Sequence, residues 1–316
     1  MTEFLTPQQL ARRTGAAVDA AVAAGRERGL TVTDAEVLHD LFSVVVHLSP
    51  APVVARIPTV LAPGTDPAEM ARRQQAELDV TRWLDEQGTP VLAPSPLVPR
   101  EPVRRDGFCL TLWQFVEQVA DTEPDYVVNA ERTAELHAAL RSYPGRLPFL
   151  SAADPDSITA SLHALDDRPD LAAAADVDRA RREWQVLEPL VRSRAAFADA
   201  FPGIDLQPLH GDSPPANLFA GVDGYRFADF ELVTFGPVEW DLAGIGPELT
   251  AAYDRGARRA GMRELDPGVL RFVNAVGMVR IVASLALVPQ QPVLAQYLQP
   301  AVEQWRDAPF AGGMAG

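Results

Sequence analysis

A histidine, two aspartates and an asparagine in the stretch 210–229 have the types and the spacing that phosphoryl transfer requires. His210, Asp212 and Asn217 form the pattern H-x-D-x-x-x-x-N, and Asp229 follows twelve residues later at the end of an apolar run. An aspartate in the first position can accept a proton from a substrate hydroxyl, while the asparagine and the second aspartate can hold Mg²⁺ against nucleotide phosphates. The pattern therefore predicts transfer of a phosphoryl group from a metal-bound nucleotide.

Other interpretations of the same residues fit less well. Asp212 and Asn217 could merely bridge backbone groups in a proline-containing loop, as such side chains often do. A metallohydrolase site would use three or more histidine or carboxylate ligands, but no other histidine has ligand spacing near this stretch. A serine hydrolase of the G-x-S-x-G type is not indicated, because that motif is absent.

The chain before about residue 116 mixes short strands with two helices. An alanine-rich helix is predicted over 7–28, with Thr6 as its N-cap and Pro7 in its first turn. Strands are predicted at 44–46 and 53–57, joined by a turn at 49–52, and a third at 108–116. Helical spacing of apolar residues after Pro67 predicts a second helix, which the Gly-Thr-Pro segment at 88–90 ends.

The chain after about residue 125 is mainly helical. Helices are predicted over 127–142, 158–165, 177–197 with a kink at Pro189, 238–259 and 268–287. The stretch 209–235 is too rich in proline and glycine for a helix, and apolar residues flank Asp223-Gly224 as in a hairpin. We predict an α+β protein with a small strand-rich N-terminal lobe, 1–116, and a larger helical C-terminal lobe, 117–316, that carries the catalytic loop and a metal-binding hairpin.

The stretch around Asp212 resembles the catalytic loop of the aminoglycoside phosphotransferase and choline kinase family, whose members have a bilobal protein-kinase-like fold. Residues 236–243, G-P-V-E-W-D-L-A, resemble the family's G-D-P-x-x-D-L-A segment, and residues 136–140 resemble its L-H-x-x-L helix. The match at 236–243 implies that Asp241 anchors the catalytic loop, the alternative being a first-turn acid favoured by the helix dipole. We expect His137 to be a hydrogen-bonded core histidine rather than a ligand.

The resemblance also implies a role for each residue of the catalytic loop. Asp212 is expected to be catalytic, and His210 is expected to support the loop together with Asp241. Asn217 and Asp229 are expected to hold the metal and, through it, the nucleotide.

In the first lobe, residues 53–57, V-V-A-R-I, resemble the family strand that reads V-A-I-K. The lysine of that strand pairs with nucleotide phosphates and with a helix glutamate. This chain has Arg56 there and no lysine anywhere. Arginine keeps the charge and can bind phosphate or carboxylate through two N–H groups. Glu77 is the expected partner of Arg56, the alternative being an ordinary solvated helix glutamate.

Two further nucleotide contacts follow from the resemblance. Residues 38–44 occupy the position of the glycine-rich loop but contain no glycine, so Ser43 is the candidate for a phosphate contact. Residues 112–117 resemble the hinge that binds adenine, which would use the Gln114 carbonyl and the Val116 amide.

Composition narrows the list of partners. The chain of 316 residues has 28 basic side chains against 43 acidic ones and a net charge of −15, which argues against binding nucleic acid through a broad basic surface. The single cysteine, Cys109, excludes an internal disulfide and a cysteine-rich metal site. The start shows no signal-peptide pattern, and Arg280 interrupts the apolar stretch 275–288, so we expect a cytoplasmic protein without a membrane partner.

These observations predict an O-phosphotransferase that uses ATP or GTP with Mg²⁺. Its acceptor would be the hydroxyl of a small molecule, either an aminoglycoside-like antibiotic or another hydroxylated metabolite, and the acidic balance of the chain favours a cationic one. The alternative is a pseudokinase-like sensor or scaffold that binds a nucleotide without transferring phosphate. The missing lysine and glycines motivate that alternative, whereas the intact catalytic-loop pattern favours the enzyme.

Overall fold

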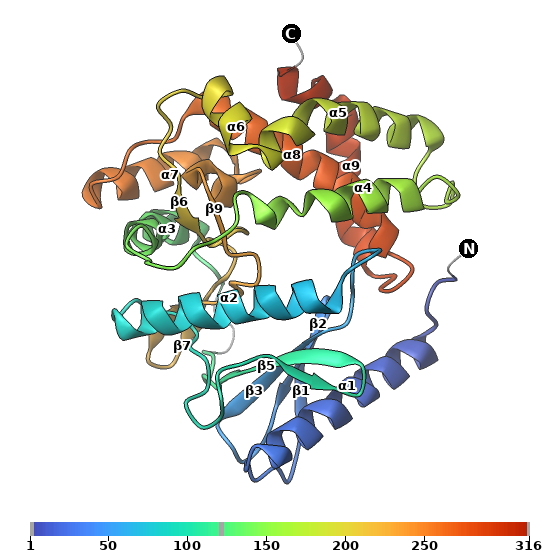
Figure 1. Cartoon of the computed structure of the whole chain (residues 1–316), viewed down its shortest axis with the longest axis vertical. Coiled ribbons are helices and arrows are strands. Elements are labelled where there is room, and N and C mark those ends of the chain that lie inside the picture. The colour runs from blue at the N-terminus through green and yellow to red at the C-terminus, as the bar shows by residue number, and fades with distance from the viewer. Residues whose placement is uncertain (1–2, 120–122, 315–316) are drawn as a thin grey trace.

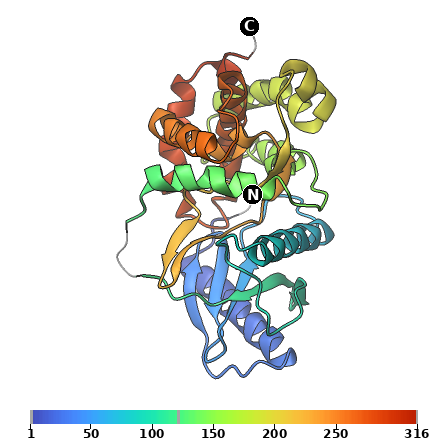
Figure 2. The same ribbon diagram turned by 90° about the vertical axis from the view of Figure 1, so that its left-hand side faces the viewer.

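The computed structural model describes residues 3–119 and 123–314, which form two lobes stacked along the long axis of the molecule (Figures 1 and 2). The N-terminal lobe is a twisted sheet between two helices, and the C-terminal lobe is mostly helical. This is the α+β, two-lobed arrangement that the sequence predicts.

The N-terminal sheet has five antiparallel strands in the order β1-β2-β3-β5-β4. They are β1 Glu36–Asp40, β2 Ser43–His47, β3 Val53–Pro58, β4 Val103–Arg105 and β5 Phe108–Gln114. Helix α1, Pro7–Glu27, covers one face of the sheet, and α2, Pro67–Glu86, lies against the other. Because successive strand residues point to opposite faces, Ala55 and Ile57 of β3 pack on the α1 side while Val54 and Arg56 face α2.

Local signals set the starts of both helices. Thr6 and Gln9 form a reciprocal capping box at the start of α1, as the cap prediction requires. Asp66 caps α2 through the amides of Ala68 and Glu69. The carboxylate of Asp66 also lies at the positive end of the helix dipole.

The C-terminal lobe contains helices, two short strand pairs and several 3₁₀ turns. In chain order they are α3 Tyr126–Leu140, η1 Ser151–Ala153, α4 Pro155–Ala164, α5 Ala174–Arg192, α6 Arg194–Ala200, β6 Gln207–Leu209, β7 Leu218–Gly221, β8 Gly224–Phe227, β9 Thr234–Gly236, η2 Val238–Leu242, α7 Gly246–Arg259, α8 Pro267–Ser284, η3 Leu285–Leu287, α9 Leu294–Asp307 and η4 Phe310–Gly313. Helix α8 runs through the centre of this lobe, where Phe272, Val276 and Val279 are fully buried.

Helix α8 together with η3, Pro267–Leu287, is long and apolar enough to cross a membrane by length and composition alone. Half of its most apolar window is buried among the other helices of the lobe. A core helix of a globular domain has the same character.

Several predicted helix boundaries were wrong. The helix predicted over 177–197 breaks at Ser193, whose side chain caps α6, while Pro189 lies inside α5 without ending it. The helix predicted over 238–259 is a 3₁₀ turn followed by α7, because Gly244 and Gly246 adopt positive φ angles of 75° and 79° that interrupt a helix. Helix α9 and strands β1, β4, β6 and β9 were not predicted at all.

Candidate active site

Two strand pairs bring the residues of the catalytic loop together. β6 pairs with β9 and β7 pairs with β8, so the loop 210–217 and the segment after β8 lie side by side. Asn217 Nδ2 donates to Asp212 Oδ2 at 3.1 Å, and the Ala228 amide donates to the Asn217 carbonyl at 2.8 Å. His210 Nε2 donates to the Ala228 carbonyl at 2.8 Å, which ties the start of the loop to the residue just before Asp229.

The start of the loop is held by a buried carboxylate. Asp241 Oδ2 accepts from the His210 amide at 3.0 Å, and Oδ1 accepts from the Gly211 amide at 2.8 Å. His137 Nε2 also donates to Asp241 Oδ2 at 2.9 Å, and the Tyr253 hydroxyl donates to His137 Nδ1 at 2.9 Å. Asp241 and His137 are completely buried, so these charge-assisted bonds satisfy a carboxylate that would otherwise be costly to bury.

Gly211 occupies a position that only glycine fits. Its φ is +91°, and a Cβ atom built there would lie 1.7 Å from the Leu232 carbonyl oxygen. Trp240 Nε1 donates to the Gly211 carbonyl at 3.0 Å. Both the backbone turn before Asp212 and the approach of the segment after Asp229 therefore depend on this glycine.

Arg56 joins the two lobes at the site. Its Nη1 donates to the Glu77 carboxylate at 2.9 and 3.0 Å, and its Nη2 lies 3.2 Å from Asp229 Oδ1. Nη2 also contacts the carboxylate of Glu231. The structure thus places Arg56, Glu77 and Asp229 in one cluster, and Glu77 is 1% exposed rather than solvated. Asp229 adopts a positive φ of 62°, a strained conformation that aspartate tolerates better than most residues.

Burial raises the pKa of Glu77 from 4.5 to about 7, and the nearby carboxylate of Asp229 adds to this effect. The positive charge of Arg56 acts in the opposite direction but does not offset the burial. The charge of Glu77 therefore changes close to neutral pH, and without this arginine its pKa would be higher still.

The proposed nucleotide contacts of the first lobe lie at the lobe interface. The segment predicted as the phosphate-covering loop is mostly strand, because only Leu41 and Phe42 separate β1 from β2, and Ser43 is buried at the start of β2. Gln291 Nε2 donates to the Leu41 carbonyl at 3.1 Å, so the C-terminal lobe holds this turn. Gln114 is the last residue of β5, and within the described residues no partner accepts from the Val116 amide.

The oxygen donors at the site suit Mg²⁺. Because Asn217 Nδ2 donates to Asp212, its Oδ1 is left as a neutral ligand, and Asp229 supplies a carboxylate. Within residues 3–119 and 123–314 no three His, Cys, Asp or Glu side chains form a metal cluster. Mg²⁺ is commonly held by only one or two carboxylates together with water and substrate phosphates, so Asn217 and Asp229 could serve as its protein ligands.

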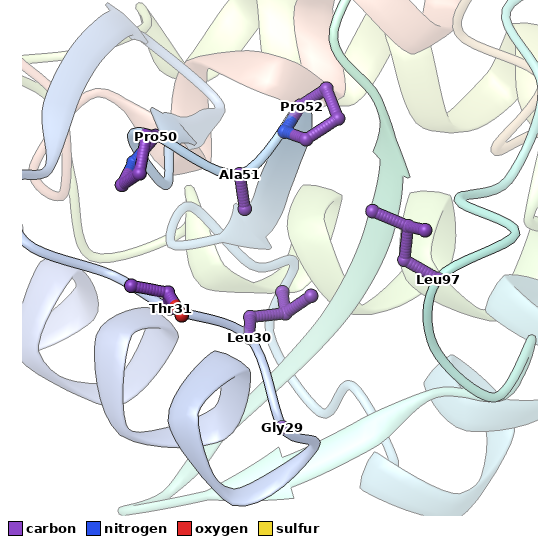
Figure 3. Close-up of a pocket in the computed structure, with 7 residues that line it drawn as sticks. All are labelled: Gly29, Leu30, Thr31, Pro50, Ala51, Pro52 and Leu97. Atoms are coloured by element: carbon purple, nitrogen blue, oxygen red, sulfur yellow. The ribbon is translucent and has the colours of Figure 1, made fainter.

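A pocket of about 390 Å³ opens elsewhere, on the N-terminal lobe between the end of α1, the turn before β3 and Leu97 (Figure 3). It is lined by Gly29, Leu30, Thr31, Pro50, Ala51, Pro52 and Leu97, none of which has a titratable side chain. This pocket has no groups that could carry out acid, base or metal chemistry.

Sequence reasoning missed three residues that support the site. Tyr253 and Trp240 complete the brace around Asp241, and Arg280 of α8 lies over the Trp240 ring at 5.7 Å from its centroid. Trp240 lies inside the matched segment 236–243, next to Asp241, which was the one signal available. The other two come from distant helices, and no sequence pattern links them to the loop.

Comparison with known proteins agrees with this geometry. The model of the phosphotransferase enzyme family matches residues 43–273. The chain belongs to this family. The prediction of an enzyme of the kinase class, with an alcohol group as acceptor, is therefore confirmed at the family level. No curated protein sequence matches the chain.

Solved structures of phosphotransferases share the fold at low sequence identity. An amicoumacin kinase in complex with AMP-PNP and Ca²⁺ has a TM-score of 0.60 at 13% identity, over 93% of this chain and 96% of that one. The choline kinase LicA from Streptococcus pneumoniae has a TM-score of 0.59 at 12% identity, over 90% and 98%. The aminoglycoside phosphotransferase APH(3'')-Id from Streptomyces rimosus has 0.52 at 19%, over 87% and 97%. The predicted kinase-like fold is confirmed.

Proposed function

We propose that this phosphotransferase moves the γ-phosphoryl group of ATP or GTP, bound with Mg²⁺, to a hydroxyl of a small molecule. The observation that carries the proposal is the cluster of Asp212, Asn217, Asp229 and Arg56 at the junction of the two lobes. Solved relatives support the nucleotide and metal, because one is described with AMP-PNP and Ca²⁺ and another with GDP.

The geometry of Asp212 suits a base that receives the proton of the acceptor hydroxyl. Its Oδ2 is held by Asn217, whereas its Oδ1 accepts no hydrogen bond from the described residues and the side chain is exposed. As the hydroxyl oxygen bonds to the γ-phosphorus, its proton passes to Asp212 and the bond to the leaving nucleoside diphosphate breaks. Asp241 and His210 keep the loop in place during this step.

The remaining residues of the cluster would bind the donor. Mg²⁺ held by Asn217 and Asp229 would neutralise charge on the transferred phosphoryl group. Arg56, fixed by Glu77, would meet the phosphates in place of the usual lysine. The Gln114 carbonyl and the Val116 amide would bind the base, and Ser43 would contact a phosphate.

The acceptor is proposed to be a small hydroxylated molecule. The solved relatives are described as acting on amicoumacin, choline, aminopropanol or aminoglycosides. We keep a cytoplasmic location and the lack of nucleic-acid and membrane partners as predictions that follow from the composition alone.

A pseudokinase is the second candidate because of one observation. Arg56 is paired not only with Glu77 but also with Asp229 and Glu231. To hold Mg²⁺, Asp229 would have to exchange its contact with this arginine for the metal. A site in which that exchange is unfavourable would bind nucleotide weakly or without metal.

Titration calorimetry with ATP and GTP, with and without Mg²⁺, tests the proposal. We expect binding that depends on Mg²⁺ and that Asp229→Asn weakens. Asp223→Asn is the matched control, because Asp223 lies in the exposed turn at the other end of β8 and has no ion pair in the described part of the chain. Nucleotide binding that is equally tight without Mg²⁺, or that is unchanged by Asp229→Asn, would contradict the metal assignment.

A further inference from the structure

Three arginines lie around the catalytic residues, and two of them are neutralised by carboxylates. Arg56 pairs with Glu77, and Arg73 of α2 pairs with Asp154 at 2.8 Å. Arg280 of α8 forms no ion pair and its guanidinium makes no hydrogen bond with any residue in 3–119 or 123–314. An arginine that is partly buried without a carboxylate partner is uncommon, because burial of an unpaired charge is costly.

The position of Arg280 beside the catalytic loop is fixed by packing. Its guanidinium lies over the ring of Trp240, and Trp240 donates its indole N–H to the carbonyl of Gly211, the residue before Asp212. The turns of α8 before Arg280 meet the chain just after η2: a Cβ atom built on Gly277 would lie 3.9 Å from the Ala243 Cβ, and Asn274 accepts from the Gly244 amide at 2.7 Å. Arg280 of α8 therefore lies next to Trp240, which supports the start of the catalytic loop at Gly211.

Arg280 lies on the catalytic-loop side of the site, because its guanidinium covers Trp240 and Trp240 donates to the Gly211 carbonyl. Asp212 and Asp154 are the acids that attract it, and both lie beyond ion-pair distance of its guanidinium. Asp229 and Glu231, at the metal and phosphate end, contact Arg56 instead. Burial lowers the pKa of Arg280, but arginine stays protonated in proteins. Arg280 is only partly buried, and no nitrogen of its side chain is among the fully buried atoms that lack a partner in the described residues, so the guanidinium keeps some contact with solvent.

We propose that Arg280 binds a carboxylate of the acceptor and so holds the acceptor hydroxyl next to Asp212. A guanidinium offers a carboxylate two parallel N–H donors, and a small hydroxy acid would then have its anionic end on α8 and its hydroxyl at the base. This inference rests on the proposed function and names the substrate class. This anionic acceptor differs from the cationic one that the net charge of the chain favours. The reason is that Arg280, the residue of α8 that lies beside the catalytic loop, is positively charged.

The test is a set of thermal-shift titrations with and without Mg²⁺-ADP. The ligands are a panel of hydroxy acids, namely glycerate, malate, 4-hydroxybutyrate, homoserine, shikimate and gluconate, each matched with its methylamide. We expect members of the acid series to raise the melting temperature of the protein, because a ligand that binds the native state stabilises it. The matched methylamides should leave the melting temperature unchanged. Arg280→Gln should weaken the binding of the acids by roughly tenfold or more, which is the contribution of one charge-assisted hydrogen bond. Binding of Mg²⁺-ADP should be unchanged.

Two further variants separate ligand binding from other effects. Arg271→Gln removes the same charge from α8 at an exposed position nine residues earlier, on the opposite side of the helix, and it should bind the acids like the wild type. Arg280→Lys should keep part of the affinity. For an acid that is turned over, Arg280→Gln should raise KM with little change in kcat or in the pH profile. If Arg280 only balanced the charge of Asp212, the variant would instead lower kcat and move the pH profile for every acceptor.

Several outcomes would overturn the inference. They are equal binding of acids and methylamides, binding of the acids by Arg280→Gln as tightly as by the wild type, or no stabilisation by any acid with or without nucleotide. Failure of the proposed function looks different: Mg²⁺-ADP would not bind, whereas the acids would still stabilise the wild type through Arg280.

Discussion

Replacement of Arg56 by methionine should destabilise the protein by an amount that grows with pH. Arg56 holds the buried Glu77 carboxylate through two contacts of 2.9 and 3.0 Å. Removal of one partner of a buried ion pair costs about 3–5 kcal/mol, because the other charge is left without compensation. That cost applies only while Glu77 is ionised, and protonation of Glu77 relieves it.

The pKa of Glu77 sets the pH range of this effect. In the folded wild type burial raises this pKa to about 7 from its ordinary value of 4.5. Between these values the folded state binds the proton more tightly than the unfolded chain does. The contribution of Glu77 to stability is therefore fully present below pH 4.5 and falls as pH rises towards 7, by about 1.4 kcal/mol per pH unit and ~3 kcal/mol in all. Without Arg56 the pKa rises further, so in the variant the fall continues above pH 7.

Urea unfolding of both proteins between about pH 5 and pH 8 measures the difference. We expect Arg56→Met to lose ~1 kcal/mol or less at pH 5 and about 1.4 kcal/mol more than that at pH 8, because pH 8 lies about one unit above the wild-type pKa of Glu77. Glu77→Gln should remove most of the pH dependence. Arg72→Met breaks an exposed pair with Glu69 on the same helix and should cost less than about 1 kcal/mol at every pH. A loss for Arg56→Met that is the same at pH 5 and pH 8 would refute the reasoning.

Two further substitutions test the brace of the catalytic loop. Asp241→Ala leaves the amides of His210 and Gly211 without an acceptor. Urea unfolding should therefore show a loss of about 3–5 kcal/mol in the free energy of unfolding. The control Asp199→Ala, at an exposed position of α6, should show no measurable loss. Gly211→Ala should lose roughly 2–4 kcal/mol and most of the turnover, because its Cβ would overlap the Leu232 carbonyl. Gly244→Ala, where φ is +75° and nothing lies near the added Cβ, should cost only about 1–2 kcal/mol. Equal losses at the two glycines would show that backbone strain alone matters.

The parts of the site that sequence could predict are those set by local spacing. The loop from His210 to Asn217 is contiguous, and the Asp-Gly turn before β8 brings Asp229 back beside it, so one motif describes the whole geometry. The alternation of β3 likewise puts Arg56 on the face that α2 covers, within reach of Glu77.

The parts that could not be predicted depend on packing between distant segments. Apolar periodicity continues across 238–259, yet Gly244 and Gly246 interrupt the helix through their positive φ angles. The contact of Arg280 with Trp240 exists only because α8 crosses η2. In the sequence Arg280 serves only to interrupt an apolar run, and nothing there links it to Asp212.

The most direct test of the central claim is transfer of the labelled γ-phosphoryl group of ATP or GTP to hydroxylated acceptors, followed by ³¹P NMR for a phosphate monoester. The wild type should form the ester, and Asp212→Asn should form it roughly 10²–10⁴-fold more slowly while it binds the Mg²⁺-nucleotide as tightly as the wild type. Wild-type rates from Asp212→Asn would contradict the assignment of the base. A wild type that binds the nucleotide, with or without Mg²⁺, but forms no ester with any acceptor would instead favour the pseudokinase.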